Sequence, residues 1–258
     1  MIRAGSLHAS KTASVTAFAA AVAVLSATPA AAMGAGSLRD NLFGARPANQ
    51  GQRASLPVAR YVSQEGDVFV LDRSQPRPLL KFEDSPEVWV LRPQPAPRGD
   101  VLYMNDLGEP VLRATRLGGL TLFTPDRPGG TAAALAGAGG ALRLAQLGPQ
   151  QLLERLAQAS AKATRAARRL IPFEADASPG SSAITADAAM IAAEAVTRIA
   201  RRSDAKAILA RIGKIRLVEG RKASASLQQG VIEITVAPAD GLAGRPSSDR
   251  IMAAASTR

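Results

Sequence analysis

Short apolar or alternating runs recur about every ten residues between Pro57 and Pro125, and this spacing constrains the fold more than any other feature. Seven runs show it: VARYV, DVFVLD, PLLKF, EVWVL, DVLYMN, PVLRATRL and LTLFTP. The segments between them contain Gly or Pro, which supply the positive or fixed φ angles of chain reversals. Strands this closely spaced are typical of an antiparallel meander rather than of βαβ units. The region is therefore predicted to form a β-rich domain, either a small sandwich or an open barrel.

Most aromatic residues beyond position 32 fall in the same region. They are Tyr61, Phe69, Phe82, Trp89, Tyr103 and Phe123. Aromatic side chains in neighbouring strands pack well across one face of a sheet. Trp89 lies between Val88 and Val90 in an alternating run. It is predicted to anchor the core or a domain interface rather than to stack on a ligand.

Beyond the strand pattern, segment 126–140 (DRPGGTAAALAGAGG) is rich in Gly and Ala. Glycine loses much backbone entropy when it is ordered, so this composition predicts a hinge between domains. Helical periodicity begins at Pro149, and apolar residues spaced three or four apart predict a helix at 149–171. A second helix is predicted from Thr185, as its N-cap, to about Arg202.

The chain ends with a short predicted helix at 204–212 and two alternating runs, KIRLVE at 214–219 and VIEITVA at 231–237. The two runs are predicted to form a terminal β-hairpin, and 238–258 a tail. The predicted fold class is α+β, with an N-terminal antiparallel β-rich domain followed by helices and the hairpin. The predicted organisation is a signal peptide at 1–32, a flexible leader at 33–56, a β-rich domain at 57–125, a hinge at 126–140, a helical layer with a β-hairpin at 141–237 and a tail at 238–258.

The first 32 residues have the three parts of a secretory signal peptide. Arg3 and Lys11 precede the apolar run AFAAAVAVL, and a small-residue site at residues 30–32 precedes Met33. The apolar run is far shorter than the roughly 20 residues of a membrane span. We therefore expect cleavage after Ala32 and a periplasmic or secreted protein with no transmembrane segment in the mature chain.

Cleavage would also remove the sole histidine, His8, and the chain has no cysteine. Without imidazole or thiol, Ser-His-Asp and Cys-His catalytic arrangements cannot form. Zinc, copper and haem sites that need His or Cys ligands are excluded as well. The sequence therefore predicts no metal site and no cofactor. It favours a non-catalytic protein over an enzyme.

Carboxylates are the catalytic groups that remain. Seven lie near the ends of the predicted strands: Glu83, Asp84, Glu87, Asp100, Asp106, Glu109 and Asp126. Two of them in a cleft could act as acid and base on a glycosidic bond. Asp and Glu beside Gly and Pro are also ordinary turn residues. A carboxylate-dependent hydrolase of an envelope polysaccharide is therefore the alternative function, and turn formation is the simpler explanation.

Positive charge is concentrated in the second half of the chain. Residues 131–258 contain 18 basic and 10 acidic side chains, whereas 33–130 contain 12 and 11. Seven basic residues fall on the two long predicted helices: Lys162, Arg165, Arg168, Arg169, Arg198, Arg201 and Arg202. If the helices pack through their alanines, these side chains could form one surface for an anionic envelope component. A solvated basic face is the alternative explanation.

Several segments together carry a resemblance to a known family. They are the block FEDSPEVWVLRPQPAPRGDVLYMNDLGEPVLRATRLGGLTLFTPDRPGG and the later LIPFEAD, GKIRLVEG and GLAGRPSSDRI. The chain resembles the domain of unknown function 4908 family, a secreted alphaproteobacterial family, over most of its mature length. This resemblance implies a bacterial envelope protein and assigns no activity and no functional residue.

Export, the missing catalytic side chains and the one-sided charge favour a non-catalytic envelope protein. Its expected partner is an anionic envelope component or an envelope protein, to which the β domain could add a strand. Nucleic acid is not an expected partner, because the chain is exported and its aromatics are not interleaved with its arginines.

Overall fold

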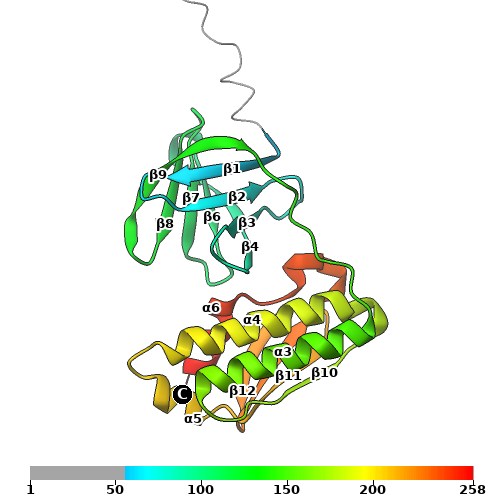
Figure 1. Cartoon of the computed structure of the whole chain (residues 1–258). Coiled ribbons are helices and arrows are strands. Elements are labelled where there is room, and N and C mark those ends of the chain that lie inside the picture. The colour runs from blue at the N-terminus through cyan, green and yellow to red at the C-terminus, as the bar shows by residue number, and fades with distance from the viewer. Residues whose placement is uncertain (1–55, 258) are drawn as a thin grey trace, which may run out of the picture. The chain divides into compact units, whose positions relative to one another are not determined.

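The computed structural model describes residues 56–257, and its first half is a nine-stranded antiparallel sheet that is nearly closed (Figure 1). The strands are β1 (Val58–Ser63), β2 (Val68–Asp72), β3 (Leu79–Phe82), β4 (Val88–Val90), β5 (Arg92–Pro95), β6 (Val101–Met104), β7 (Pro110–Ala114), β8 (Leu120–Thr124) and β9 (Arg127–Ala138). Their order in the sheet is β4-β3-β2-β1-β9-β8-β7-β6-β5. Of the two predicted architectures, the barrel is therefore the one that forms. We call this sheet the barrel.

Alternation along the strands places the core inside the barrel. In β1, Ala59, Tyr61 and Ser63 are buried, whereas the residues between them are at least partly exposed. Tyr61 stacks on Phe69 of β2 with ring centroids 5.5 Å apart. The aromatic residues therefore pack across neighbouring strands, as their clustering in the sequence predicts.

Segment 126–140 is not a hinge: residues 127–138 form β9, the longest strand of the barrel. β9 pairs with β1 on one side and with β8 on the other, so it joins the two meanders. Its Gly and Ala residues have low strand propensity, but ladders on both sides compensate for it. At Gly130, φ is +83°, and a Cβ atom would lie 2.5 Å from Cγ2 of Thr121. Glycine is required there by both conformation and space.

The second half is a four-stranded sheet with helices on one face. Its elements are α3 (Pro149–Ala167), β10 (Phe173–Asp176), α4 (Ser182–Ala200), α5 (Ala205–Ala210), β11 (Lys214–Glu219), β12 (Ser224–Gln228), β13 (Val231–Val236) and α6 (Ser248–Ser256). Three 3-10 turns complete the described chain: η1 (Pro97–Gly99), η2 (Pro179–Ser181) and η3 (Pro238–Gly244).

The strand order of this sheet is β10-β11-β13-β12, which differs from the predicted pairing. The two predicted strands, β11 and β13, are parallel neighbours rather than the two arms of a hairpin. The hairpin is formed instead by β12 and β13, which meet at a two-residue turn, Gln229 and Gly230. The long link after β11 therefore contains a strand. β12 has the weakly apolar sequence SASLQ, so periodicity did not reveal it.

α4 is the central helix of this half. It contacts α3, α6 and the strands β11 and β13, so it is covered on several sides. Its sequence is correspondingly apolar on most faces, with buried alanines that let neighbouring helices approach closely. The helix starts earlier than predicted, after Ser181, and Thr185 lies buried inside it rather than at its N-cap.

Residues 238–258 were predicted to be a tail, but their described part is folded. η3 turns the chain, and α6 then packs Ile251 and Ala255 into the same core as α4. Ser247 caps α6 by accepting a hydrogen bond from the amide of Arg250 at 3.0 Å. A serine N-cap before a helix with two buried apolar positions explains why this segment is ordered.

The α+β fold class is thus confirmed. All described residues belong to one compact unit, Pro47–Arg258. Within residues 56–257, no helix is long and apolar enough to cross a bilayer. The predicted signal peptide at 1–32 and leader at 33–56 lie outside the described residues, apart from Leu56.

Candidate functional site

The main candidate site among the described residues is a cleft of about 420 Å³. Its lining comes from the barrel strands β4 and β5, the turns beside them, the start of β12 and the chain from η3 to α6. The lining residues are Arg77, Trp89, Val90, Arg92, Asn105, Asp106, Lys222, Ala223, Ser224, Ala225, Asp240, Ala243, Arg245, Pro246, Ser247 and Arg250. This volume falls within the range of small-molecule and peptide sites.

Basic side chains outnumber acidic ones in the cleft by five to two, and one of the five, Arg245, is paired with carboxylates outside the lining. Arg92 donates from Nη2 to the backbone oxygen of Asp106 at 3.3 Å, and Arg250 donates from Nη2 to the same oxygen. Two guanidinium groups therefore meet at one carbonyl. Among the described residues, the carboxylate of Asp106 is the one within 4.0 Å of either guanidinium, at 4.0 Å from Nε of Arg250. Like charges held this close leave a local excess of positive charge.

Arg77 and Lys222 add two further cations from separate segments. Both are exposed, and no carboxylate of the described residues lies within 4.0 Å of their charged nitrogens. Arg77 lies in the turn between β2 and β3, and Lys222 lies in the link that precedes β12. Only the tertiary fold brings these two segments to the same cleft.

The cleft also has apolar lining. Trp89 is partly buried and contacts Phe82 edge-on, with ring centroids 6.3 Å apart. Val90, Ala223 and Ala225 border the same cleft. The packing of Trp89 against the barrel core agrees with its predicted role as an anchor. A ligand in the cleft would therefore meet both cations and an apolar wall.

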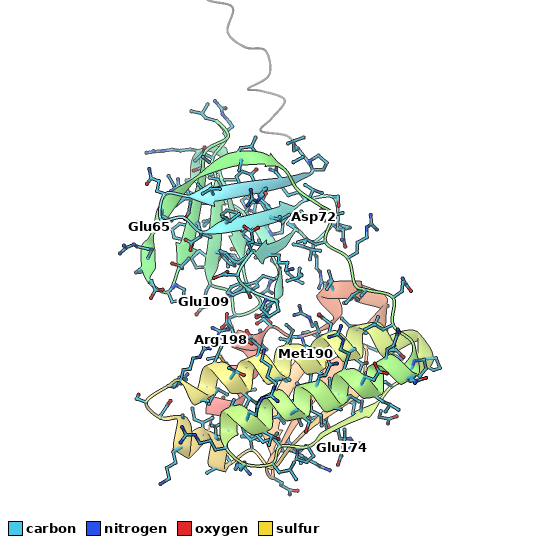
Figure 2. The ribbon with its side chains drawn as sticks, viewed as in Figure 1. Glu65, Asp72, Glu109, Glu174, Met190 and Arg198 are labelled. Carbon is cyan, nitrogen blue, oxygen red and sulfur yellow. The ribbon has the colours of Figure 1, made fainter. Side chains whose placement is uncertain are left out.

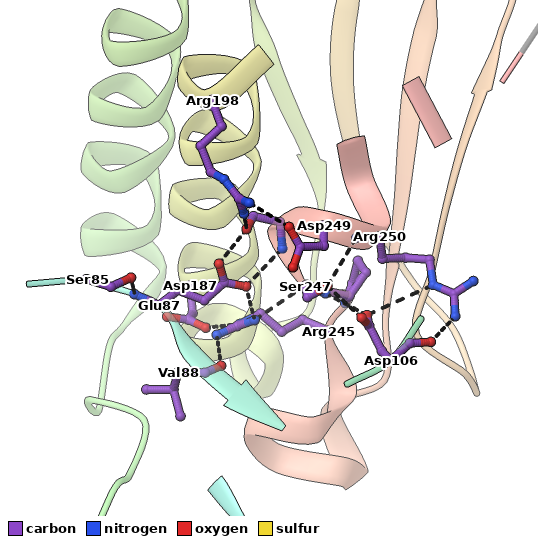
Figure 3. Close-up of polar contacts among 12 residues, drawn as sticks. Ser85, Glu87, Val88, Asp106, Asp187, Arg198, Arg245, Ser247, Asp249 and Arg250 are labelled. Carbon is purple, nitrogen blue, oxygen red and sulfur yellow. Dashed lines mark hydrogen bonds and ion pairs between the residues drawn. The ribbon is translucent and has the colours of Figure 1, made fainter. Parts of the chain in front are cut away.

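Arg245 lies at the base of this arrangement, with its side chain 1% exposed (Figure 3). Its Nη2 donates to the backbone oxygen of Val88 in β4 at 2.9 Å, and its Nε pairs with the carboxylate of Asp187 on α4. Nη1 lies 3.9 Å from Oε1 of Glu87. One buried guanidinium thus connects the barrel with α4, and two carboxylates compensate its charge.

Two barrel carboxylates hold the start of α6. Glu87 accepts from the amide and the hydroxyl of Ser248 at 2.9 and 2.5 Å. Asp106 accepts from the amide and the hydroxyl of Ser247 at 3.0 and 2.6 Å. Negative groups at the first turn of a helix are favoured by its free amides and its dipole. These contacts fix the chain that forms one side of the cleft (Figure 3).

Burial raises the pKa of Glu87, and the Arg245 guanidinium and the Ser248 hydrogen bonds offset only part of this effect. The network continues through Ser248, whose hydroxyl accepts from Nη1 of Arg198 at 2.6 Å. Arg198 lies on α4 (Figure 2) and also pairs with Asp249 at 2.7 Å.

Of the seven basic residues predicted to form an anionic-surface site, four are bound within the protein. Lys162 pairs with Glu194 at 2.5 Å, Arg198 with Asp249, and Arg202 with Asp204 at 2.8 Å. Arg169 donates instead to the backbone oxygens of 209 and 212, beside α5. The remaining three have no carboxylate of the described residues within 4.0 Å: Arg165, Arg168 and Arg201. The cluster is on α3, α4 and the residues that follow them, whereas none of its members lines the cleft.

Most of the predicted catalytic carboxylates are bound within the protein. Glu83 pairs with Arg60 at 3.0 Å, Asp100 with Arg113 at 2.5 Å, and Glu109 accepts from Asn105 at 2.9 Å. Glu87 and Asp106 hold α6, as described above. Asp84 and Asp126 make no hydrogen bond or ion pair through their side chains with other described residues. Asp106 alone of the seven lines the cleft, and both its oxygens are engaged by Ser247.

Nothing in the described part of the chain groups three or more metal-binding side chains.

Sequence reasoning missed most of the cleft. Arg77, Arg92 and Arg250 are isolated basic residues in separate segments, and no local pattern connects them. Lys222 follows Arg221 in a basic link, but its neighbours across the cleft were not predictable. The signal that could have been used is Ser247 before an apolar run, because a serine in that position predicts a helix start rather than a tail.

The comparisons with known proteins identify the family. The family model described as domain of unknown function (DUF4908) matches residues 37–255. The chain belongs to this family. The match covers every described strand and helix of the chain except the last residue of α6. The searches of curated proteins and of solved structures gave no match.

Proposed function

We propose that this member of the DUF4908 family is an exported, non-catalytic envelope protein that binds an anionic ligand in the cleft. The observation that supports it most is the meeting of Arg92 and Arg250 at one carbonyl oxygen, with Asp106 as the one carboxylate of the described residues within 4.0 Å. Arg77 and Lys222 extend the positive charge across the lining. A bound anion would relieve the repulsion among these cationic groups, and the cleft walls would partly shield the anion from water.

This proposal moves the predicted anionic site from the helices to the cleft. Intramolecular partners engage four of the seven helix cations, and they also engage Arg92, Arg245 and Arg250 of the cleft, so pairing alone does not separate the two sites. The cleft also offers an apolar wall and backbone groups, which are the features that add specificity to charge. Export remains part of the proposal and is supported by the composition of residues 1–32.

The test compares two pairs of charge reversals. The cleft variant is Arg77→Glu with Lys222→Glu, and the helix variant is Arg165→Glu with Arg201→Glu. All four residues are exposed and have no carboxylate partner among the described residues, so the two variants change the net charge equally. Calorimetric titration with hexaglutamate and with lipopolysaccharide, over a series of salt concentrations, measures binding of a peptide anion and an envelope anion.

We expect the unmodified chain to bind at least one probe more weakly as salt rises, because salt screens the attraction. The affinity of the cleft variant should fall about tenfold or more, and the helix variant should bind almost as tightly as the unmodified chain. Loss in the helix variant alone would place the site on α3 and α4. Equal loss in both variants would show that only net charge matters, and either result would overturn the proposal.

A further inference from the structure

The cleft contains an open strand edge as well as cations. β12 is the last strand of its sheet and pairs only with β13. Ala223, Ser224 and Ala225, at the start of β12, line the cleft. An edge strand presents backbone N–H and C=O groups that an incoming extended chain can pair with.

The hairpin turn determines which backbone groups of β12 are free. Gln229 and Gly230 both have positive φ, 48° and 81°, as in a type I′ two-residue turn. In such a hairpin the residues that flank the turn, Gln228 and Val231, form a hydrogen-bonded pair. Hydrogen-bonded and non-hydrogen-bonded pairs then alternate along the hairpin. The backbone groups of Ser226 and Ser224 therefore bond to β13, whereas those of Ala225 point to the outer edge of β12.

A side-chain contact agrees with the register of this hairpin. The hydroxyl of Ser224 donates to that of Thr235 at 3.1 Å, directly across from it in β13. Apart from the ladder with β13, no backbone–backbone hydrogen bond of the described residues involves Ala223 or Ala225. The outward backbone groups of Ala225 therefore have no backbone partner among the described residues, and α6 packs against the same strand.

We infer that the ligand of the cleft is an extended acidic segment of a partner protein, which adds a strand to the free edge of β12. The inference rests on the proposed binding of an anion in the cleft and names its chemical class. Strand addition supplies backbone hydrogen bonds, and alternate side chains of the partner lie towards the cleft wall. Acidic side chains in these positions face Arg77, Arg92, Lys222 and Arg250, and the intervening side chains lie on the opposite face of the added strand.

The chain's own leader does not fit this role chemically. Residues 33–55 contain three arginines and one aspartate, so the segment is basic like the cleft. A segment of about five residues suffices for the free edge, since a strand rises about 3.3 Å per residue.

The experiment uses octapeptides of alternating Glu and Val, labelled with fluorescein, and fluorescence anisotropy with the mature chain. Comparison peptides replace Glu by Lys, or carry N-methyl groups either on all Glu amides or on all Val amides. A strand presents every other amide to a given neighbour, so one methylated peptide loses its hydrogen bonds to β12 and the other retains them.

We expect the acidic peptide to bind and the Lys peptide not to bind. One of the two methylated peptides should bind about tenfold more weakly than the unmodified peptide. The affinity of the other should change less. Ala225→Pro removes the free N–H of the open edge and should weaken binding by a similar factor, whereas Ala225→Ser should not. Pro is tolerated on an edge where its missing N–H would face outwards. Thermal unfolding checks that both variants are folded.

Two results would overturn the inference and still leave the proposed function in place. The first is that both methylated peptides bind with the same affinity as the unmodified peptide, while the cleft variant still binds the acidic peptide more weakly. The second is tighter, cleft-dependent binding of oligogalacturonate, an acidic oligosaccharide, than of the acidic peptide. If the cleft variant binds every anion as well as the unmodified chain does, the proposed function itself is wrong.

Discussion

At the residue scale, Glu87 and Asp72 are two buried carboxylates with opposite pKa shifts. Burial raises the pKa of Glu87 beyond what Arg245 and Ser248 restore. Burial also opposes ionisation of Asp72, but hydrogen bonds from Ser74 and from the amide of Leu142 hold its pKa below the usual value. The two groups should therefore affect stability in opposite directions as the pH changes.

For Glu87, the folded chain holds the proton to a higher pH than the unfolded chain. Its contribution to the unfolding free energy is full below the ordinary glutamate pKa of about 4.3 and is lost as the pH rises through the raised value. Glutamine does not titrate. Glu87→Gln should therefore become more stable relative to the unmodified chain as the pH rises through this window, as measured by urea unfolding at successive pH values.

Asp72→Asn is the matched control with the opposite sign. In the unmodified chain, the Asp72 carboxylate contributes stability above the ordinary aspartate pKa of about 3.9. This stability is lost as the pH falls through the lowered pKa of the folded chain. The asparagine variant should thus become less stable, relative to the unmodified chain, as the pH rises. Parallel slopes for the two variants would contradict these assignments.

At the scale of elements, β9 shows how glycine permits a strand that composition argues against. A Cβ atom on Gly130 would lie 2.8 Å from Cε1 of Phe123, and its φ of +83° is unfavourable for other residues. Gly130→Ala should lower the unfolding free energy by about 1–3 kcal/mol. Gly129→Ala is the control, because no atom lies within 4 Å of its Cβ position and its φ is not positive. Equal losses in denaturant unfolding would show that β9 tolerates any side chain.

α6 is the second element that the sequence did not predict. Ile251 is fully buried in the core that α4 shares. Ile251→Ala should lower the unfolding free energy by about 2–5 kcal/mol, since it leaves a cavity in a packed core. Leu117→Ala removes a comparable side chain that is 92% exposed and should change stability by about 0.5 kcal/mol or less. If the two substitutions behave alike, α6 does not dock in solution.

At the scale of the whole molecule, the barrel and the helix-covered sheet are connected through a few polar residues. Arg245 reaches Val88 of the barrel and Asp187 of α4, and the Ser247–Ser248 pair binds Asp106 and Glu87. The same segment forms one side of the cleft. Stability of this network and formation of the binding site are therefore coupled.

Export is also a property of the whole chain. Expressed in a bacterium with a periplasm, the protein should be recovered from the periplasmic fraction with Met33 as its first residue, by intact mass and N-terminal sequencing. Leucine at both 30 and 32 should block cleavage, because signal peptidase requires small residues there. Recovery of the unmodified chain in the cytoplasm with residues 1–32 attached would contradict the export prediction.

The sequence by itself determined the α+β class, seven of the barrel strands and the two long helices, because these depend on local periodicity and on turn residues. It also indicated the family. Tertiary structure decided the rest. β9 exists because β1 and β8 pair with it, and α6 because Ile251 finds the core of α4. The cleft depends on Arg77, Arg92, Lys222 and Arg250, which are far apart in sequence and share no pattern. Long-range pairing and charge placement are set by neighbours in space, and local propensity contains no record of them.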